Sequence, residues 1–351
     1  MAVAAKTTMP VAAGSGRRRY ALLLALWDSE YAKNVYGGYR NVFVAAFGEE
    51  GERWDCFRVI AGEFPAPEDL ASYDGFVVSG SPHDAYGDDP WVRRLCALLR
   101  TLHAMEKRVL GVCFGHQVLC RALGGRVGKA RNGWDVGVKK VTFVRDLEGF
   151  GFLGGLEELP SSASLVEVHQ DEVWELPPGA TALAYSEKTR VEAFAVGEHA
   201  LGIQGHPEYT ADILHNLVDR LTGQSAIPAS VGEEARRTVA ETGGPDRVFW
   251  TGLCKRFLRG GESSSPRPPP VRDMAPEAMM TSLAVTDCPD RAFWMGLCKR
   301  FLGGGGSSPR PAAPVRDTAP EVMMTSLAAT GCFGSAAAGR RSNGQLVGSQ
   351  R

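Results

Sequence analysis

Cys113 stands where a strand is expected to turn into a helix. Its segment reads RVLGVCFGHQ, with a buried strand predicted to end at Val112 and a helix to begin near Gly115. A nucleophile on such a turn needs small neighbours because the backbone is strained, and Gly111 and Gly115 meet that need. The N-terminus of the helix also favours a thiolate. This context predicts a cysteine nucleophile rather than a buried structural cysteine.

A thiol nucleophile needs a base, and His206 is the candidate. It lies in the segment GIQGHPEY, directly after a predicted strand over residues 200–204. Glu208 follows two residues later, so an extended His-x-Glu would put both side chains on one side. The carboxylate could then hold the imidazole tautomer and support its positive charge, and Pro207 stiffens the link. A lone surface histidine is the alternative.

Two backbone amides are candidates for an oxyanion hole, which stabilises the negative charge that develops on a carbonyl oxygen under attack. The amide of Phe114, next to the nucleophile, faces the same side of the turn. Gly80, in the segment VSGSPHD, follows another predicted strand and lets the backbone approach a substrate closely. An ordinary turn is the alternative for Gly80.

The elements that position these residues alternate along the chain. Short apolar runs and amphipathic segments indicate an α/β fold with a doubly wound, mostly parallel, flavodoxin-like sheet, whose ligands bind at the carboxyl ends of the strands. Some of the later, Val-rich strands are expected to be antiparallel. The predicted strands cover residues 20–27, 54–60, 75–79, 108–112, 136–144, 164–168, 181–186, 190–196 and 200–204, and the predicted helices cover residues 38–47, 91–107, 116–123, 211–221 and 233–241.

The chain divides into three parts. Residues 1–19 are small, polar and basic, which predicts disorder; residues 20–261 form the catalytic domain; residues 262–351 form a low-complexity, mostly disordered tail. A 44-residue unit, residues 245–288, recurs as residues 289–332. Each copy holds one amphipathic helix, and the helix of the first copy is expected to dock on the domain as its end.

Composition excludes several classes of partner. The 351 residues carry a net charge of −1, which argues against nucleic acid or an anionic membrane surface. No apolar run is long enough to span a membrane. Three arginines before a short apolar stretch resemble a signal peptide, but a first strand is the better interpretation. The eight cysteines form no CxxC pair, which favours reduced thiols in the cytosol.

The three segments together resemble the class I glutamine amidotransferase family over about residues 20–225. The resemblance implies a Cys–His–Glu triad and transfer or hydrolysis at a γ-glutamyl carbonyl. The family pattern Gly-x-Cys-x-Gly-x-Gln is matched by Gly111, Cys113, Gly115 and Gln117, and the pattern Gly-x-Gln-x-His-Pro-Glu by Gly202, Gln204, His206, Pro207 and Glu208.

The same resemblance implies the substrate-binding residues. Gln117 would contact the glutamyl group. His169 and Gln170, with Asp171 beside them, occupy the place of a family segment that lines the pocket, although a surface turn is the alternative. Asp135 begins a stretch whose backbone the family uses. No metal and no cofactor are expected.

One departure from the family pattern narrows the range of expected substrates. Many amidotransferases have a second glycine where Ser81 stands, and the variant SGSPHDAYGDDPW looks like the plant γ-glutamyl peptidases, which act on glutathione conjugates. That resemblance reaches about residue 260. We find no second catalytic domain, so a stand-alone hydrolase of a small γ-glutamyl substrate is the leading hypothesis. The alternatives are a glutaminase subunit that supplies ammonia to a separate synthase, and a non-catalytic scaffold.

Overall fold

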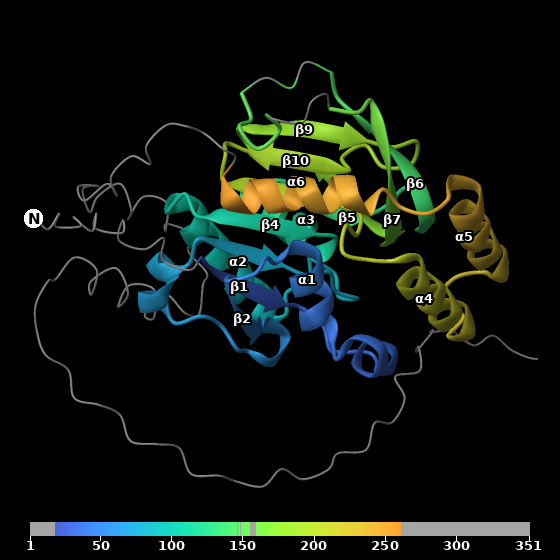
Figure 1. The fold of residues 1–351 in the computed structure, drawn as a ribbon, viewed down its shortest axis with the longest axis horizontal. Helices are drawn as coiled ribbons and strands as arrows, with labels where there is room; N and C mark the ends of the chain where they lie inside the picture. The colour runs from blue at the N-terminus through green and yellow to red at the C-terminus, as the bar shows by residue number, and fades with distance from the viewer. Residues whose placement is uncertain (1–17, 146, 148, 155–158, 261–351) are drawn as a thin grey trace, which may run out of the picture. The chain divides into compact units, whose positions relative to one another are not determined.

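The computed structural model describes residues 18–145, 147, 149–154 and 159–260 (Figure 1). The predictions for the first 17 residues, for the tail and for the second copy of the repeat lie outside the described residues. The sequence places the start of the domain at residue 20, and the first strand begins at Arg19.

Nine strands form the main sheet, and five neighbouring strands of it run parallel. This half confirms the predicted α/β sheet, and helices connect its strands (Figure 1). In spatial order the five are β2 (Arg53–Arg58), β1 (Arg19–Leu24), β3 (Gly75–Val78), β4 (Arg108–Val112) and β11 (Ala200–Ile203).

Four antiparallel strands extend the sheet beyond β11, as the Val-rich runs led us to expect. They are β10 (Ala193–Val196), β9 (Ala180–Tyr185), β6 (Asp135–Phe143) and β7 (Ser162–His169), and β7 is the edge strand. A separate antiparallel pair, β5 (Arg126–Lys129) and β8 (Asp171–Glu175), was not predicted. Both are short and rich in charged residues, so they lack the apolar run that identifies the other strands.

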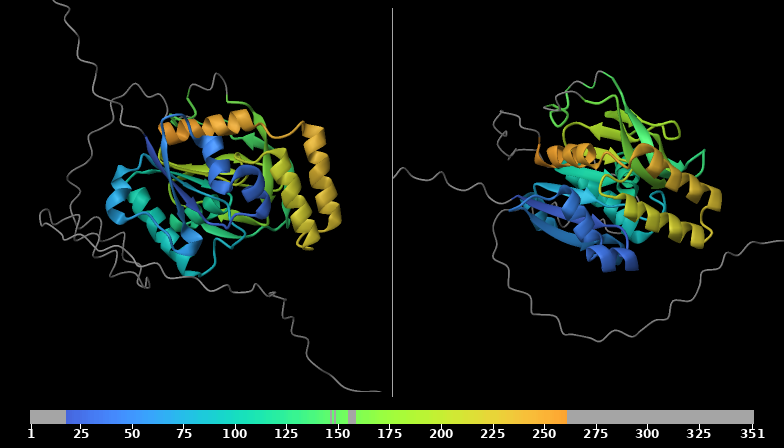
Figure 2. Two further views of the ribbon diagram at one scale, coloured as in Figure 1. Left: turned by 60° about the horizontal axis from the view of Figure 1, so that its bottom comes forward. Right: turned by 45° about the vertical axis from the view of Figure 1, so that its right-hand side comes forward.

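Helices cover both faces of the sheet (Figure 2). One face carries α1 (Tyr39–Phe47) and α6 (Arg247–Arg259), and the other carries α2 (Pro90–Ala104) and α3 (Phe114–Ala122). Two further helices, α4 (Ala211–Gly223) and α5 (Ala229–Thr242), lie side by side. Short helical turns complete the described elements: η1 (Ala32–Tyr36), η2 (Val59–Ala61) and η3 (Pro67–Ser72).

Strand β1 shows why its sequence is apolar throughout. Tyr20, Leu22 and Leu24 pack into the core on one face of the sheet, and Ala21 and Leu23 pack into the core on the other. Side chains alternate between the two faces of a strand, so a strand covered on both faces needs a continuous apolar run. The helical layers on both sides therefore follow from the composition of the strand.

Helix α6 docks as the sequence predicts. Trp250 and Phe257 are fully buried on its inner side, and the Trp250 indole N–H donates to the carbonyl of Ser164 on β7 at 3.1 Å. Asp246, just before the helix, accepts from the Ser164 amide at 2.6 Å and donates its own amide back to the Ser164 carbonyl at 2.9 Å. The helix of the first copy of the repeat thus packs on the domain, as expected.

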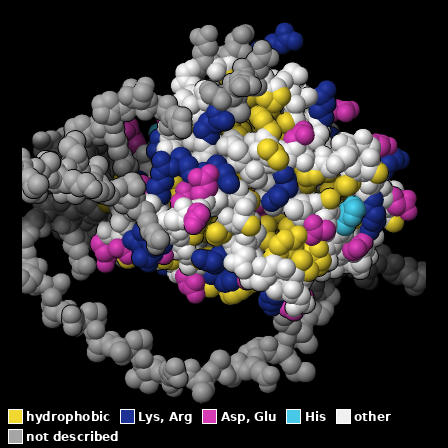
Figure 3. Space-filling view, viewed as in Figure 1, with side chains coloured by type: hydrophobic (Ala, Val, Ile, Leu, Met, Phe, Trp, Pro, Cys, Tyr) yellow, Lys and Arg dark blue, Asp and Glu magenta, His cyan; other side chains and the backbone are white. Residues whose placement is uncertain are grey.

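The described surface carries charge of both signs. Positive and negative side chains are interspersed on the face that Figure 3 shows, in line with the small net charge. Among the described residues, no helix has the length and apolar character required to cross a bilayer.

Candidate active site

The backbone at Cys113 is strained in the way that a nucleophile-bearing turn requires. Cys113 joins β4 to α3 with φ 53° and ψ −106°, a conformation that costs energy for any residue with a Cβ atom. The turn is possible because two glycines let other backbone approach closely. A Cβ on Gly111 would collide with the Gly115 carbonyl, and one on Gly115 would collide with the carbonyl of Val78.

The sheet brings His206 to Cys113. Strand β11 lies beside β4 and runs parallel to it, so their carboxyl ends meet, and the Cys113 amide donates to the carbonyl of Ile203 at 2.9 Å. His206 follows three residues after Ile203. Its own amide donates to the Val166 carbonyl on β7 at 2.8 Å. The loop that carries His206 is therefore tied both to the nucleophile's turn and to the edge strand.

Glu208 orients the imidazole as the His-x-Glu spacing predicts. Nδ1 of His206 lies 2.9 Å from Oε1 of Glu208, and both side chains are buried. A carboxylate accepts, so Nδ1 carries the proton and Nε2 is left for the Cys113 thiol, with which the ring also interacts. Burial lowers the pKa of His206, but attraction to Glu208 and Cys113 outweighs it and raises that pKa well above its usual value. This arrangement favours a protonated His206 ring beside the Cys113 side chain.

Gly80 lies against the side chains of both Cys113 and His206. A Cβ there would stand 2.9 Å from Cε1 of His206 and 3.7 Å from Cβ of Cys113, so the absence of a side chain keeps this side of the site open. Phe114 is the first residue of α3, and the amides of a first helical turn have no acceptor within the helix. Both predicted oxyanion donors thus belong to backbone that borders Cys113.

Tyr209 is a site residue that the sequence analysis missed. Its ring stacks on the His206 imidazole, with centroids 4.1 Å apart and planes 1° from parallel. Tyr209 is buried, and its ring covers one face of the His206 imidazole and so limits how far the imidazole can tilt. Its position directly after Glu208 in GIQGHPEY was visible, but stacking depends on the path of the chain after Pro207, which spacing alone does not reveal.

Gln117 lies on α3 one helical turn beyond Cys113 and is buried. Its side-chain amide donates to the Asp171 carbonyl at 2.9 Å and to Oε1 of Gln204 at 3.2 Å. These bonds join the helix of the nucleophile to β8 and to the loop of His206. The predicted contact of Gln117 with a glutamyl group stays a prediction.

The other predicted pocket residues lie on the edge strand β7, directly after it, and on the neighbouring strand β6. Asp135 pairs with His169 across β6 and β7, and both are buried. His169 Nδ1 lies 3.0 Å from the carbonyl of Asp171, while Gln170 is half-buried and its carbonyl accepts from the Ala130 amide at 2.8 Å. Their role in substrate binding stays a prediction.

The geometry is suited to acyl transfer. It combines a strained thiol at a helix N-terminus, an imidazole held in one tautomer by a buried carboxylate, and two bordering backbone amides. Such an arrangement attacks a carbonyl and protonates the group that leaves. Among the described residues all five cysteines are free, so no disulfide competes for Cys113.

Comparisons with known proteins point to one family. Residues 32–217 match the model of the class-I glutamine amidotransferases. The chain is 50% identical to γ-glutamyl peptidase 3 of Arabidopsis thaliana over 245 residues, which is 70% of this chain and 98% of that protein. It is also 50% identical over 245 residues to γ-glutamyl peptidase 5 of the same plant, covering 70% of this chain and 96% of the relative.

Solved structures agree on the fold. A glutamine amidotransferase from Thermotoga maritima superposes with a TM-score of 0.52 at 25% identity, covering 69% of this chain and 99% of that one. A glutamine amidotransferase from Methylobacillus flagellatus superposes with a TM-score of 0.52 at 20% identity, covering 73% and 99%.

Proposed function

Because this chain belongs to the class I glutamine amidotransferase family, we propose that it hydrolyses the γ-glutamyl bond of glutathione conjugates or related γ-glutamyl peptides. The observation that carries the proposal is the placement of Cys113 on a strained turn beside a buried His206–Glu208 pair. The similarity to peptidases along 98% of a relative's length supports a peptide substrate over free glutamine.

The chemistry follows from the positions of the groups. The Cys113 thiolate attacks the γ-carbonyl, and the amides of Gly80 and Phe114 stabilise the oxyanion. His206, held by Glu208, donates its Nε2 proton to the leaving amine, which leaves a γ-glutamyl thioester. His206 then takes a proton from water, which attacks the thioester and releases glutamate, and the Cys113 thiolate and the protonated His206 are restored.

Loss of the thiol provides the test. Cys113→Ala should abolish glutamate release, measured by mass spectrometry over a panel of glutathione conjugates and γ-glutamyl dipeptides, while the melting temperature stays near that of the wild type. Cys56→Ala, at a half-buried cysteine on β2, is the matched control and should keep full activity. Unchanged turnover by Cys113→Ala would contradict the mechanism.

The same panel separates the two enzymatic alternatives. Free glutamine is included, and ammonia is measured beside glutamate. Turnover of conjugates that exceeds turnover of glutamine supports a peptidase. Ammonia from glutamine, with no glutamate from any peptide, would overturn the peptidase proposal in favour of a glutaminase that serves a separate synthase.

A further inference from the structure

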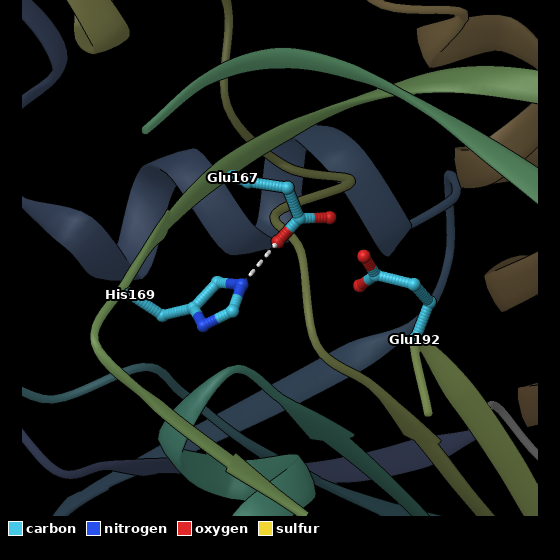
Figure 4. Close-up of side chains that lie close together, drawn as sticks. All are labelled: Glu167, His169 and Glu192. Atoms are coloured by element: carbon cyan, nitrogen blue, oxygen red, sulfur yellow. Dashed lines mark ion pairs between the residues drawn. The ribbon is translucent and has the colours of Figure 1, made fainter. Parts of the chain in front are cut away.

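Three buried side chains of types that bind metal ions lie close together near His206, and none of them belongs to the Cys–His–Glu triad. Glu167 and His169 extend from β7, and Glu192 extends from the residue just before β10 (Figure 4). One nitrogen or oxygen atom of each lies within 4.8 Å of the others. We refer to these three residues as the Glu–His–Glu cluster.

The carboxylates of this cluster lack donors. Glu167 and Glu192 are 0% exposed, and among the described residues none of their four carboxylate oxygens has a hydrogen-bond partner of normal geometry, although the Ser186 side chain favours the charged form of Glu192. Figure 4 shows the two carboxylates pointing toward each other. The neighbouring carboxylate of Asp135, 3.7 Å from Nζ of Lys139, adds further negative charge. His206 and Lys139 attract the Glu167 carboxylate but do not outweigh its burial, because its pKa stays well above the usual value. Buried charge of one sign requires a compensating positive charge.

The tautomer of His169 is the second, independent observation. Its Nδ1 lies 3.0 Å from the carbonyl oxygen of Asp171, and a carbonyl only accepts, so Nδ1 carries the proton. In the neutral ring Nε2 then holds a lone pair, and it faces Oε2 of Glu167 at 3.4 Å. Metal-bound histidines characteristically donate their other ring N–H to a backbone carbonyl or carboxylate. The lone pair and the carboxylates thus converge on a place that suits a cation.

We propose that Glu167, His169 and Glu192 bind a divalent transition-metal ion, with Zn²⁺ the best match. Two carboxylates and one imidazole are a ligand set that zinc accepts, and three protein ligands are typical of zinc sites with one further position. Tetrahedral zinc with bonds of about 2.0–2.1 Å places neighbouring ligand atoms roughly 3.4 Å apart. The distance between Nε2 of His169 and Oε2 of Glu167 has this value.

The site would tie the loop of His206 to the sheet. The His206 amide donates to Val166, next to Glu167, and the Gln204 amide donates to the Glu192 carbonyl at 2.7 Å. A Cβ on Gly205 would collide with the Glu167 carboxylate, so the cluster lies directly against the residue before His206. A bound ion would crosslink β7 and the start of β10 under the catalytic loop, in a structural role.

Protonation of Glu167 and Glu192 is the competing explanation for how their negative charge is removed. Burial raises the pKa of Glu167 and of Glu192 well above the usual value, and neighbouring carboxylates add to the effect. Two protonated glutamic acids would also remove the negative charge, without any metal. The experiment must therefore distinguish one bound ion from two bound protons.

The test uses the full chain carrying Cys113→Ala, so that the catalytic thiol cannot capture the metal. The protein is stripped with a chelator and titrated with Zn²⁺ and with Co²⁺, and uptake is measured by mass spectrometry and by the Co²⁺ absorption spectrum. We expect one ion per chain and a melting temperature that rises on addition of Zn²⁺. The double variant Glu167→Gln/Glu192→Gln should bind Zn²⁺ more than about 100-fold more weakly, while Glu187→Gln, at an exposed residue, should bind as the parent does.

Each outcome decides the matter. No uptake by the folded, stripped protein would overturn the proposal in favour of protons, and equal uptake by the double glutamine variant would place the metal elsewhere. If the double variant fails to fold, the Co²⁺ spectrum of the Cys113→Ala chain decides, because absence of the absorption of a four- or five-coordinate ion also overturns the proposal. None of these readouts depends on the substrate.

Discussion

At the scale of the residue, His206 has two partners on opposite ring nitrogens. Nδ1 donates a hydrogen bond to the Glu208 carboxylate, and the Cys113 side chain also interacts with the ring. The raised pKa of His206 keeps the imidazolium present as the pH rises past its ordinary value of 6.5. In the proposed reaction, the leaving amine would therefore meet a charged acid over a wide range of pH.

Glu208→Gln should shift the pH dependence of catalysis. Loss of the negative charge removes the main attraction that raises the pKa of His206, so that pKa falls. The basic limb of the kcat/KM profile should then move to lower pH, while Glu233→Gln on the exposed side of α5 should leave it in place. A basic limb at the wild-type pH in Glu208→Gln would show that Glu208 does not govern the imidazole.

Some site residues were readable from the sequence and others were not. Cys113, His206 and Glu208 lie in short local patterns whose geometry follows from the strand ends beside them. Tyr209 was missed because stacking requires the chain to turn after Pro207. The Glu–His–Glu cluster was missed because Glu192 lies just before a separate strand, and no sequence spacing predicts that it lies close to Glu167 and His169.

At the scale of the element, the turn between β4 and α3 leaves almost no space for added side-chain atoms. Gly115→Ala should lower the free energy of unfolding by about 1–3 kcal/mol, since the new methyl group would meet the carbonyl of Val78. Denaturant unfolding measures the change. Gly252→Ala is the matched control: nothing lies within 4 Å of its added Cβ, and alanine in a helix interior should stabilise α6 by roughly 0.5–1 kcal/mol. Equal effects of the two variants would contradict this account.

The sequence predicted those strands and helices whose burial produces a recognisable apolar pattern. Strand β1 is apolar throughout because both its faces are covered, and it was found. Among the strands that the structure describes, β5 and β8 pair only with each other, and they carry charged residues such as Arg126 and Glu175, which form an ion pair across them. Neither strand has a pattern that separates it from a loop.

At the scale of the whole molecule, α6 closes one side of the core. Phe257 is fully buried against Phe152, with ring centroids 5.2 Å apart. Phe257→Ala should therefore cost about 3–5 kcal/mol of unfolding free energy, measured by thermal or denaturant unfolding. Val248→Ala on the same helix removes a side chain that is 90% exposed and should change stability by less than about 0.5 kcal/mol. A small loss in Phe257→Ala would mean that α6 is not needed to complete the core.

The edge strand β7 gives the domain a consequence beyond catalysis. An uncovered edge offers unpaired backbone groups to other chains, and proteins block such edges to avoid aggregation. Along the outer side of β7, the Asp246 side chain accepts a hydrogen bond from the Ser164 amide, and the Asp246 amide donates to the Ser164 carbonyl. The His206 amide donates to the Val166 carbonyl. The loop that holds His206 therefore also covers part of the sheet edge. A change that loosens this loop would both misplace the imidazole and expose a strand to which a second molecule can add.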